Sequence, residues 1–177
     1  MRLAVTGGIA EGKSTVVGYL RDAGYSTASA DAVAREVFGT SEVQSWIVER
    51  LGSSEPARVR EAVASDASFR RSLNRLTHPR ILHKLDRLRA DVVEVPLLIE
   101  ACLQSRFDRV WVVTCGPEEQ LRRLAERLGG VPSAESLLAT QLASRVKIPF
   151  ADCIVRTNLP EETVRGYVLD AVFASLG

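Results

Sequence analysis

Short apolar runs rich in β-branched residues alternate along the chain with longer segments whose apolar residues recur at helical spacing. Alternating strands and helices are typical of an α/β protein with a mostly parallel sheet. We therefore predict a five-stranded parallel sheet flanked by helices. Its strands are expected at Leu3–Thr6, around Tyr25–Ala28, and at Val92–Val95, Val110–Thr114 and Cys153–Val155.

The stretch between the second and third predicted strands is too long for one crossover helix. It favours helix from Asp31 to Arg89, and turn-forming residues interrupt it at Gly52–Pro56. We predict a second interruption at Thr77-His78-Pro79, because the residue before a proline is pushed out of helical geometry. Three or four helices are therefore expected over one end of the sheet.

A further break between two helices is predicted at Gly129–Ser133, where a pair of glycines precedes a proline. Ser133 is a suitable N-cap for the helix that follows this break. With 177 residues, the whole chain has the length of a single compact domain that needs no disulfide or metal to stabilise its core.

The charge of the chain is balanced and spread along its length. Basic residues number 23 and acidic residues 22, giving a formal net charge of +1, and 46% of the residues are hydrophobic. This composition is typical of a soluble globular protein and indicates no face for nucleic acid or membrane, so an anionic ligand has to be bound by a local site. The 3 cysteines are far apart, and no signal-peptide pattern is present, which predicts a reduced, cytoplasmic protein.

A glycine-rich turn follows the first predicted strand. Residues 7–14 have the pattern G-x-x-x-x-G-K-S, and helix-favouring residues come directly after them. Glycines let backbone N–H groups turn toward phosphate oxygens, and the N-terminus of the next helix adds partial positive charge. We predict that Lys13 reaches the β- and γ-phosphates of ATP and that Ser14 holds Mg²⁺. The predicted nucleotide site comprises Gly8, Ala10, Glu11, Gly12, Lys13, Ser14 and Thr15.

Glu11 is an unusual residue for such a loop, because a carboxylate repels bound phosphate groups. We expect its side chain to point away from the ligand into solvent, as an ordinary exposed residue of the turn.

Motifs along nearly the whole chain resemble those of the dephospho-CoA kinase family. The motifs are TGGI at 6–9, ADAVAREV at 30–37, LNRLTHPRI at 73–81, VPLLIE at 95–100 and QLRRLAER at 120–127, with Gln141 and Ala151-Asp152 completing the series. A phosphate-binding loop alone also occurs in GTPases and motor ATPases, whereas the His-Pro and Pro-Leu-Leu-x-Glu segments are more specific. The resemblance implies a P-loop NTPase fold and the ATP- and Mg²⁺-dependent phosphorylation of the ribose 3′-hydroxyl of dephospho-CoA, the last step of coenzyme A synthesis.

The resemblance also implies roles for residues outside the loop. Asp31 would orient the acceptor hydroxyl and take its proton, although an aspartate here also suits the N-cap of a helix over Ala32–Phe38. Arg123 and Arg127 lie four residues apart on a predicted helix face, where they would stabilise the transferred phosphate as a lid at about 120–147 closes, or form a solvated face. A helical acceptor region at about 31–89 and the strand ends would supply the other contacts. Arg58, His78 and Leu97 would contact the acceptor, although a histidine before a proline also suits a structural role. Thr157, or Asn158 with a shift of one residue, would contact adenine. Arg122 and Arg145 are expected to be solvated.

Two positions depart from the family pattern near the expected acceptor. Ser29 precedes Ala30-Asp31 where an aspartate is usual, so one of two acidic groups is missing, and Glu94 replaces an aspartate. Glu94 and Glu100 bracket the third predicted strand, where each either approaches Mg²⁺ through water or serves in a cap or ion pair.

These departures keep two other functions open: another small-molecule P-loop kinase, or a nucleotide-binding protein with little catalysis. The expected partners are the small molecules ATP and dephospho-CoA, and the expected state is a monomer or weak oligomer.

Overall fold

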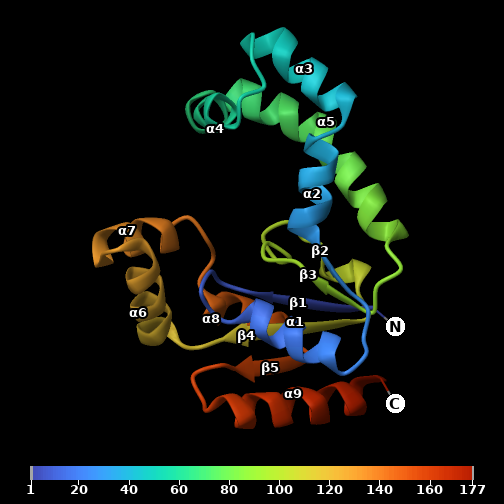
Figure 1. Ribbon diagram of the computed structural model, residues 1–177, viewed down its shortest axis with the longest axis vertical. Helices are drawn as coiled ribbons and strands as arrows, with labels where there is room; N and C mark the ends of the chain where they lie inside the picture. Colours follow the sequence, from blue (N-terminus) through green and yellow to red (C-terminus); the bar gives the residue numbers. More distant parts are fainter. Residues whose placement is uncertain (1, 177) are drawn as a thin grey trace. The chain divides into compact units, whose positions relative to one another are not determined.

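The computed structural model describes residues 2–176, and the side chains of residues 2–174. The chain divides into two compact units, residues 1–29 with 89–177 and residues 30–88. The first unit contains the sheet and the phosphate-binding loop (Figure 1). The second contains the helices expected between residues 31 and 89.

A parallel sheet of five strands forms the centre of the first unit, in the order β2-β3-β1-β4-β5. The strands are β1 (Leu3–Gly7), β2 (Thr27–Ser29), β3 (Val92–Glu94), β4 (Arg109–Thr114) and β5 (Cys153–Arg156). All five lie where the alternation of apolar runs predicted them. Every residue of β1 is buried because parallel strands are covered on both faces, which is why these segments appear in the sequence as continuous apolar runs.

Helices α1 (Lys13–Asp22) and α9 (Glu161–Leu176) pack against each other, and their apolar residues share one core with the sheet. Trp111 on β4 is fully buried in this core, beside Leu20 of α1 and Val168 of α9. The core fixes the start of α1 at the carboxyl end of β1, which is where the glycine-rich turn lies (Figure 1).

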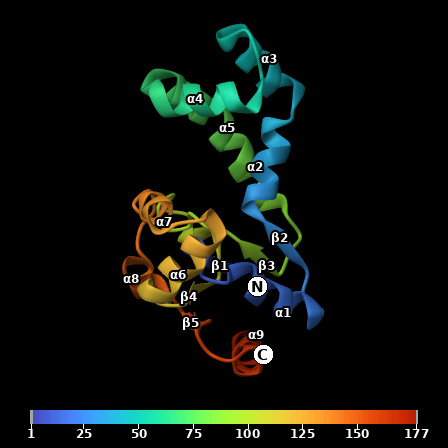
Figure 2. The same ribbon diagram turned by 60° about the vertical axis from the view of Figure 1, so that its left-hand side comes forward.

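The segment expected as a lid forms α6 (Pro117–Leu128), α7 (Val131–Leu138) and α8 (Ser144–Lys147), followed by a short 3₁₀ turn at Ile148–Phe150. Helices α6 and α7 lie side by side in both ribbon views (Figures 1 and 2). The predicted cap at Ser133 is wrong: Gly130 precedes the helix, and Ser133 lies inside its first turn. Pro132 explains the earlier start, because its fixed φ suits the first helical positions.

Four helices make up the second unit, in agreement with the three or four expected. They are α2 (Ala30–Phe38), α3 (Ser41–Leu51), α4 (Pro56–Ser65) and α5 (Ala67–Arg87). Their common core contains Val37, Ile47, Phe69 and Leu73, and the rings of Trp46 and Phe69 are 5.6 Å apart.

Two local predictions for these helices are wrong. Helix α5 continues through Pro79, because residues on both sides of the proline, including Leu73 and Ile81, pack on the same core and hold the helix together. Asp31 is not an N-cap, because α2 begins one residue earlier at Ala30 and places Asp31 in its first turn.

Candidate nucleotide site

The phosphate-binding loop joins β1 to α1 through a backbone that few residue types tolerate. Gly12 has a φ of 89° and Ala10 a φ of 62°, both in the left-handed region. Gly12 takes this conformation without a steric penalty, whereas for a residue with a Cβ it costs on the order of 1 kcal/mol. The strain at Ala10 has to be offset by contacts that hold the neighbouring residues of the loop.

A cavity of about 360 Å³ opens beside this loop. Lys13, Ser14 and Thr15 line it at the N-terminus of α1, where backbone N–H groups and the helix dipole favour an anion. Arg123 and Arg127 of α6 line it as well. The lining is completed by Ile9, Ala10 and Gly12. The fold therefore brings three cationic side chains to one cavity at the end of β1.

Lys13 is anchored within the loop. Its ammonium nitrogen donates to the carbonyl oxygen of Gly8 at 2.8 Å, and its side chain is largely buried. Gly8 itself lies under two side chains, because a Cβ at this position would meet the amide of Gln120 and the carboxylate of Glu11. A side chain at position 8 would thus displace groups that shape the loop.

Glu11 does not point into solvent, so the prediction for its side chain is wrong. It is 1% exposed, and its carboxylate accepts hydrogen bonds from the backbone N–H of Gly8 and from the hydroxyls of Thr114 and Ser144. A buried carboxylate is tolerated when enough donors replace its water shell, and here three donors do so. Gly8 belongs to the same loop, whereas Thr114 lies on β4 and Ser144 on α8.

Two glutamines hold the peptide groups of Ile9. The side-chain amide of Gln120 donates to the Ile9 carbonyl at 2.9 Å, and the Ile9 N–H donates to Gln141 Oε1 at 3.2 Å. Both glutamines are part of the expected lid, yet the sequence motifs suggested no contact with the loop for either. Such contacts are invisible in the sequence because 111 and 132 positions separate the partners.

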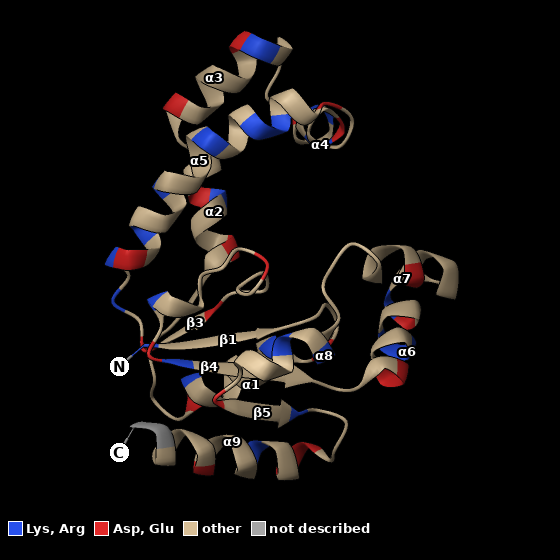
Figure 3. Cartoon of the chain, turned by 180° about the vertical axis from the view of Figure 1, so that it is seen from behind, with Lys and Arg blue, Asp and Glu red and all other residues tan. Residues whose placement is uncertain are grey.

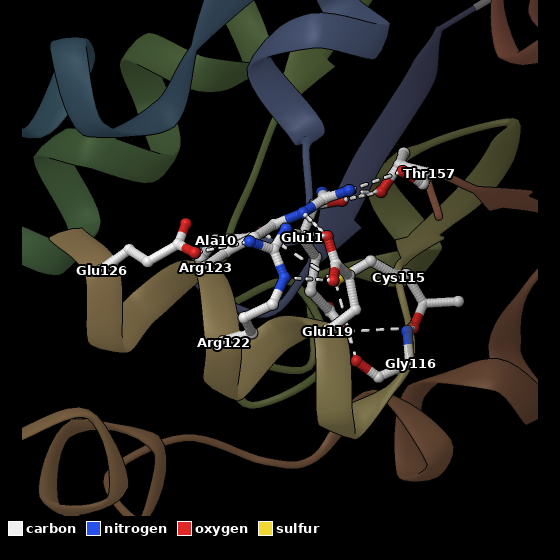
Figure 4. A network of polar contacts seen from close by, with 10 residues as sticks. Ala10, Glu11, Cys115, Gly116, Glu119, Arg122, Arg123, Glu126 and Thr157 are labelled. Atoms are coloured by element: carbon white, nitrogen blue, oxygen red, sulfur yellow. Dashed lines mark hydrogen bonds and ion pairs between the residues drawn. The ribbon is translucent and has the colours of Figure 1, made fainter. Parts of the chain in front are cut away.

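Arg123 connects α6 to the end of β5. Its guanidinium donates to the Thr157 carbonyl at 2.7 Å and to the Thr157 hydroxyl at 3.3 Å, while its Nε donates to Glu119 at 2.7 Å (Figure 4). Thr157 in turn donates to the Glu11 carbonyl at 2.7 Å. These bonds join the predicted adenine contact, the loop and a predicted catalytic arginine into one network.

Acidic and basic residues alternate along α6 (Figure 3), and Glu119, Arg122, Arg123 and Glu126 form ion pairs there. Hydrogen bonds from Arg122 and then Arg123 lower the pKa of Glu119 to about 2. Arg122 is exposed and also pairs with Glu126. Arg122 and Arg145 are both exposed, as expected.

A second cavity, of about 440 Å³, adjoins the first through the shared lining residues Gly12, Thr15 and Arg123. Tyr19, Thr157, Leu159, Glu161 and Val164 form the rest of its wall. Burial, followed by the charge of Glu161, raises the pKa of the Tyr19 hydroxyl, which therefore remains a neutral hydrogen-bonding group. The wall combines apolar and polar groups, as a heterocyclic base requires.

The segment after β3 carries Leu97, which is 49% exposed, and Glu100. Of the two roles expected for Glu100, the structure contains the ion pair, because the ammonium of fully buried Lys147 lies 2.7 Å from it. Lys147 also donates to the Pro96 carbonyl at 3.1 Å.

Glu94 of β3 is the register partner of Ser29 of β2. Their side chains therefore lie next to each other on the same face of the sheet.

The remaining predicted residues belong to the helical unit. Asp31 lies on α2, Arg58 on α4 and His78 on α5, and all three side chains are exposed. Among the described residues, no group of three or more His, Cys, Asp or Glu side chains could hold a metal ion, and no helix is long and apolar enough to cross a membrane.

Comparison with known proteins identifies relatives across nearly the whole chain. The family model for dephospho-CoA kinase (CoaE) matches residues 1–161. The dephospho-CoA kinase of Thermosynechococcus vestitus is 36% identical, over 100% of this chain and 95% of that protein.

Solved structures extend the comparison to the fold. The TT1252 protein of Thermus thermophilus superposes with a TM-score of 0.84 at 26% identity, over 100% of this chain and 98% of that one. Dephospho-CoA kinase from Campylobacter jejuni superposes with a TM-score of 0.64 at 21% identity, over 98% of this chain and 96% of that one, a likeness of fold alone.

Proposed function

Because this chain belongs to the dephospho-CoA kinase family, we propose that it transfers the γ-phosphoryl group of ATP to the ribose 3′-hydroxyl of dephospho-CoA, giving coenzyme A and ADP. The observation that carries the proposal is the cavity where the phosphate-binding loop meets Lys13, Arg123 and Arg127. Three cations around one anion-binding loop suit a triphosphate, whose charge grows toward the leaving oxygen during transfer.

In this mechanism the 3′-oxygen forms a bond to the γ-phosphorus as the bond from that phosphorus to the β–γ bridging oxygen breaks. Lys13 neutralises the β- and γ-phosphates, and the arginines of α6 stabilise the charge that develops on the transferred group. The adjoining cavity lined by Tyr19 and Thr157 takes the adenine ring.

Mg²⁺ suits the chemistry of this site. Ser14 lines the phosphate cavity and offers a hydroxyl oxygen, and Mg²⁺ takes oxygen ligands, mostly from phosphates and water. None of the described residues that line this cavity is acidic, so phosphates and water would supply most ligands of the ion, which would neutralise phosphate charge when bound. Ser14 is the residue that would hold it.

Asp31 is proposed as the group that orients the acceptor hydroxyl and receives its proton, with Arg58, His78 and Leu97 as acceptor contacts. Support for these roles comes from the family membership together with the exposure of all four side chains. Asp31 lies in the first turn of α2, and an exposed carboxylate there can orient a hydroxyl and accept its proton as transfer proceeds.

The test is a coupled assay of ADP release with ATP and Mg²⁺, comparing dephospho-CoA with adenosine, shikimate, gluconate and no acceptor. Release that requires dephospho-CoA, with coenzyme A identified by mass, is the expected result. Release with another acceptor would assign the chain a different substrate. ADP binding without any turnover would favour a nucleotide-binding protein with little catalysis.

Lys13→Ala is the variant that tests the loop, and Lys84→Ala is its control. Lys84 lies on α5 in an exposed ion pair with Glu36, so its loss removes a lysine without touching the loop. We expect Lys13→Ala to abolish turnover in a folded protein and Lys84→Ala to retain it. Equal turnover in the two variants would contradict the role of the loop.

A further inference from the structure

Glu11 is the one acidic side chain of the phosphate-binding loop, and the reaction does not use it. Its carboxylate is 1% exposed, so it does not contact a ligand in the cavity. Burying a carboxylate costs free energy unless hydrogen bonds replace its contacts with water. The question is what the three donors around it hold in place.

The donors come from three separate parts of the first unit. Gly8 is in the loop, Thr114 ends β4 and Ser144 begins α8. Oε2 accepts from the Gly8 N–H and the Ser144 hydroxyl, and Oε1 accepts from the Thr114 hydroxyl at 3.0 Å. One carboxylate therefore fastens the loop to the sheet and to the last helix of the lid segment.

The loop conformation needs such a fastening. Ala10, immediately before Glu11, has the left-handed φ of 62°, and a strained residue of this kind persists only where its surroundings fix it. The carbonyl of Glu11 is held by the Thr157 hydroxyl at 2.7 Å, and Ile9 is held on both sides of its peptide group by Gln120 and Gln141. Hydrogen bonds therefore hold both neighbours of Ala10, Ile9 before it and Glu11 after it.

We propose that Glu11 is a positioning residue, which holds the phosphate-binding loop in its nucleotide-binding conformation through the hydrogen bonds of its buried carboxylate. A loop already in the bound conformation loses less conformational entropy when the nucleotide binds, so affinity for nucleotide depends on it. The inference rests on the proposed kinase function only in taking ATP and ADP as the ligands of this loop.

Glu11→Ala and Glu11→Gln separate this role from a structural one. Alanine leaves all three donors without a partner, whereas glutamine keeps the shape and one acceptor oxygen for the Gly8 N–H. The Kd of ADP is measured by calorimetry without acceptor, and kcat and KM for each substrate by the coupled assay. We expect Glu11→Ala to raise the Kd of ADP and the KM of ATP by about tenfold or more, with the KM of dephospho-CoA unchanged and Glu11→Gln within about threefold of the parent.

Thr114→Val provides a second variant in case Glu11→Ala fails to fold. It keeps the size of the side chain and removes one donor to Glu11, together with the hydroxyl oxygen that accepts from the Gly116 N–H. Thr77→Val is the matched control, because Thr77 is also a buried threonine, and its hydroxyl donates to the Leu73 carbonyl on α5. Weaker ADP binding by Thr114→Val but not by Thr77→Val is expected.

The outcomes distinguish this inference from the proposed function. Unchanged ADP affinity in folded Glu11→Ala, or in Thr114→Val, would overturn the positioning role, even if the melting temperature fell. A Glu11→Gln variant as weak as Glu11→Ala would overturn the assignment to hydrogen-bond geometry. Failure of the parent protein to bind ADP would overturn both the inference and the proposed kinase function.

Discussion

Gly7 is the position where the geometry of the loop allows the sharpest prediction. It ends β1 and is paired with Val113 of β4, and its φ is 151°. A Cβ at Gly7 would lie well inside 3.0 Å of the Val113 carbonyl oxygen, which belongs to the backbone of the central sheet. The clash cannot be relieved by rotating a side chain, so Gly7→Ala has to move β1 away from β4.

The expected cost has two parts. Forcing extra volume into a packed site costs about 1–3 kcal/mol, and holding a non-glycine residue at such a φ costs about 1–3 kcal/mol more. A total of about 2–6 kcal/mol lowers the melting temperature of a protein of this size by roughly 5–20 °C. ADP affinity should fall as well, since β1 carries the loop.

Gly18→Ala is the matched control. Gly18 lies in the middle of α1, and a Cβ there would meet no atom within 4 Å. Alanine has the higher helix propensity by about 1 kcal/mol, so this variant should melt roughly 2–4 °C above the parent. Circular dichroism at 222 nm follows both melts. If Gly7→Ala melted within about 2 °C of the parent, the argument from backbone contact would be refuted.

Three further predictions concern single side chains. Asp31→Asn should lower kcat by about 10²–10⁴ with ADP affinity unchanged. The control Asp22→Asn, at the exposed end of α1, should leave kcat unchanged. A lower melting temperature with unchanged kcat in Asp31→Asn would contradict the catalytic role. Asp66 caps α5 by accepting from two backbone N–H groups, which lower the pKa of its carboxyl. The stability from this cap is present above the usual pKa of 3.8 and is lost as the pH falls through the lower pKa of the folded state. Asp66→Ala should therefore melt roughly 2–4 °C below the parent at pH 7, and the difference should vanish in acid. Burial shields the Cys115 thiol from solvent and raises its pKa, whereas Cys102 is exposed. Iodoacetamide at pH 8 should therefore modify Cys102 first, as peptide mass spectrometry would show. Equal labelling of Cys102 and Cys115 would contradict the packing of Cys115 beside the loop.

The chemistry-bearing part of the site could largely be predicted from the sequence. The motif at residues 7–14 specifies its own backbone, since glycine at position 12 permits the left-handed turn and the next residue begins a helix. The arginine pair on α6 also lines the cavity, as its helical spacing suggested. These features are local, and local patterns are what a sequence displays directly.

Where local rules were applied to Glu11 and Pro79, they gave the wrong answer. A carboxylate in a phosphate-binding loop is expected to be exposed, because it repels phosphate. The hydroxyls of Thr114 and Ser144 make the burial of Glu11 possible, although they lie 103 and 133 positions away in the sequence. A proline should interrupt a helix, yet packing on both sides of it holds α5 together.

By itself, then, the sequence determined the strands, the phosphate-binding loop and the family of this protein, because apolar period, glycine placement and motif spacing act over a few residues. Only the tertiary structure decided what surrounds the loop: the burial of Glu11, the hydrogen bonds of Gln120 and Gln141 to Ile9, and the hydrogen bonds of Arg123 to Thr157. The physical reason is that a hydrogen bond or a packed contact depends on distance in space. Folding brings together partners that no local pattern pairs.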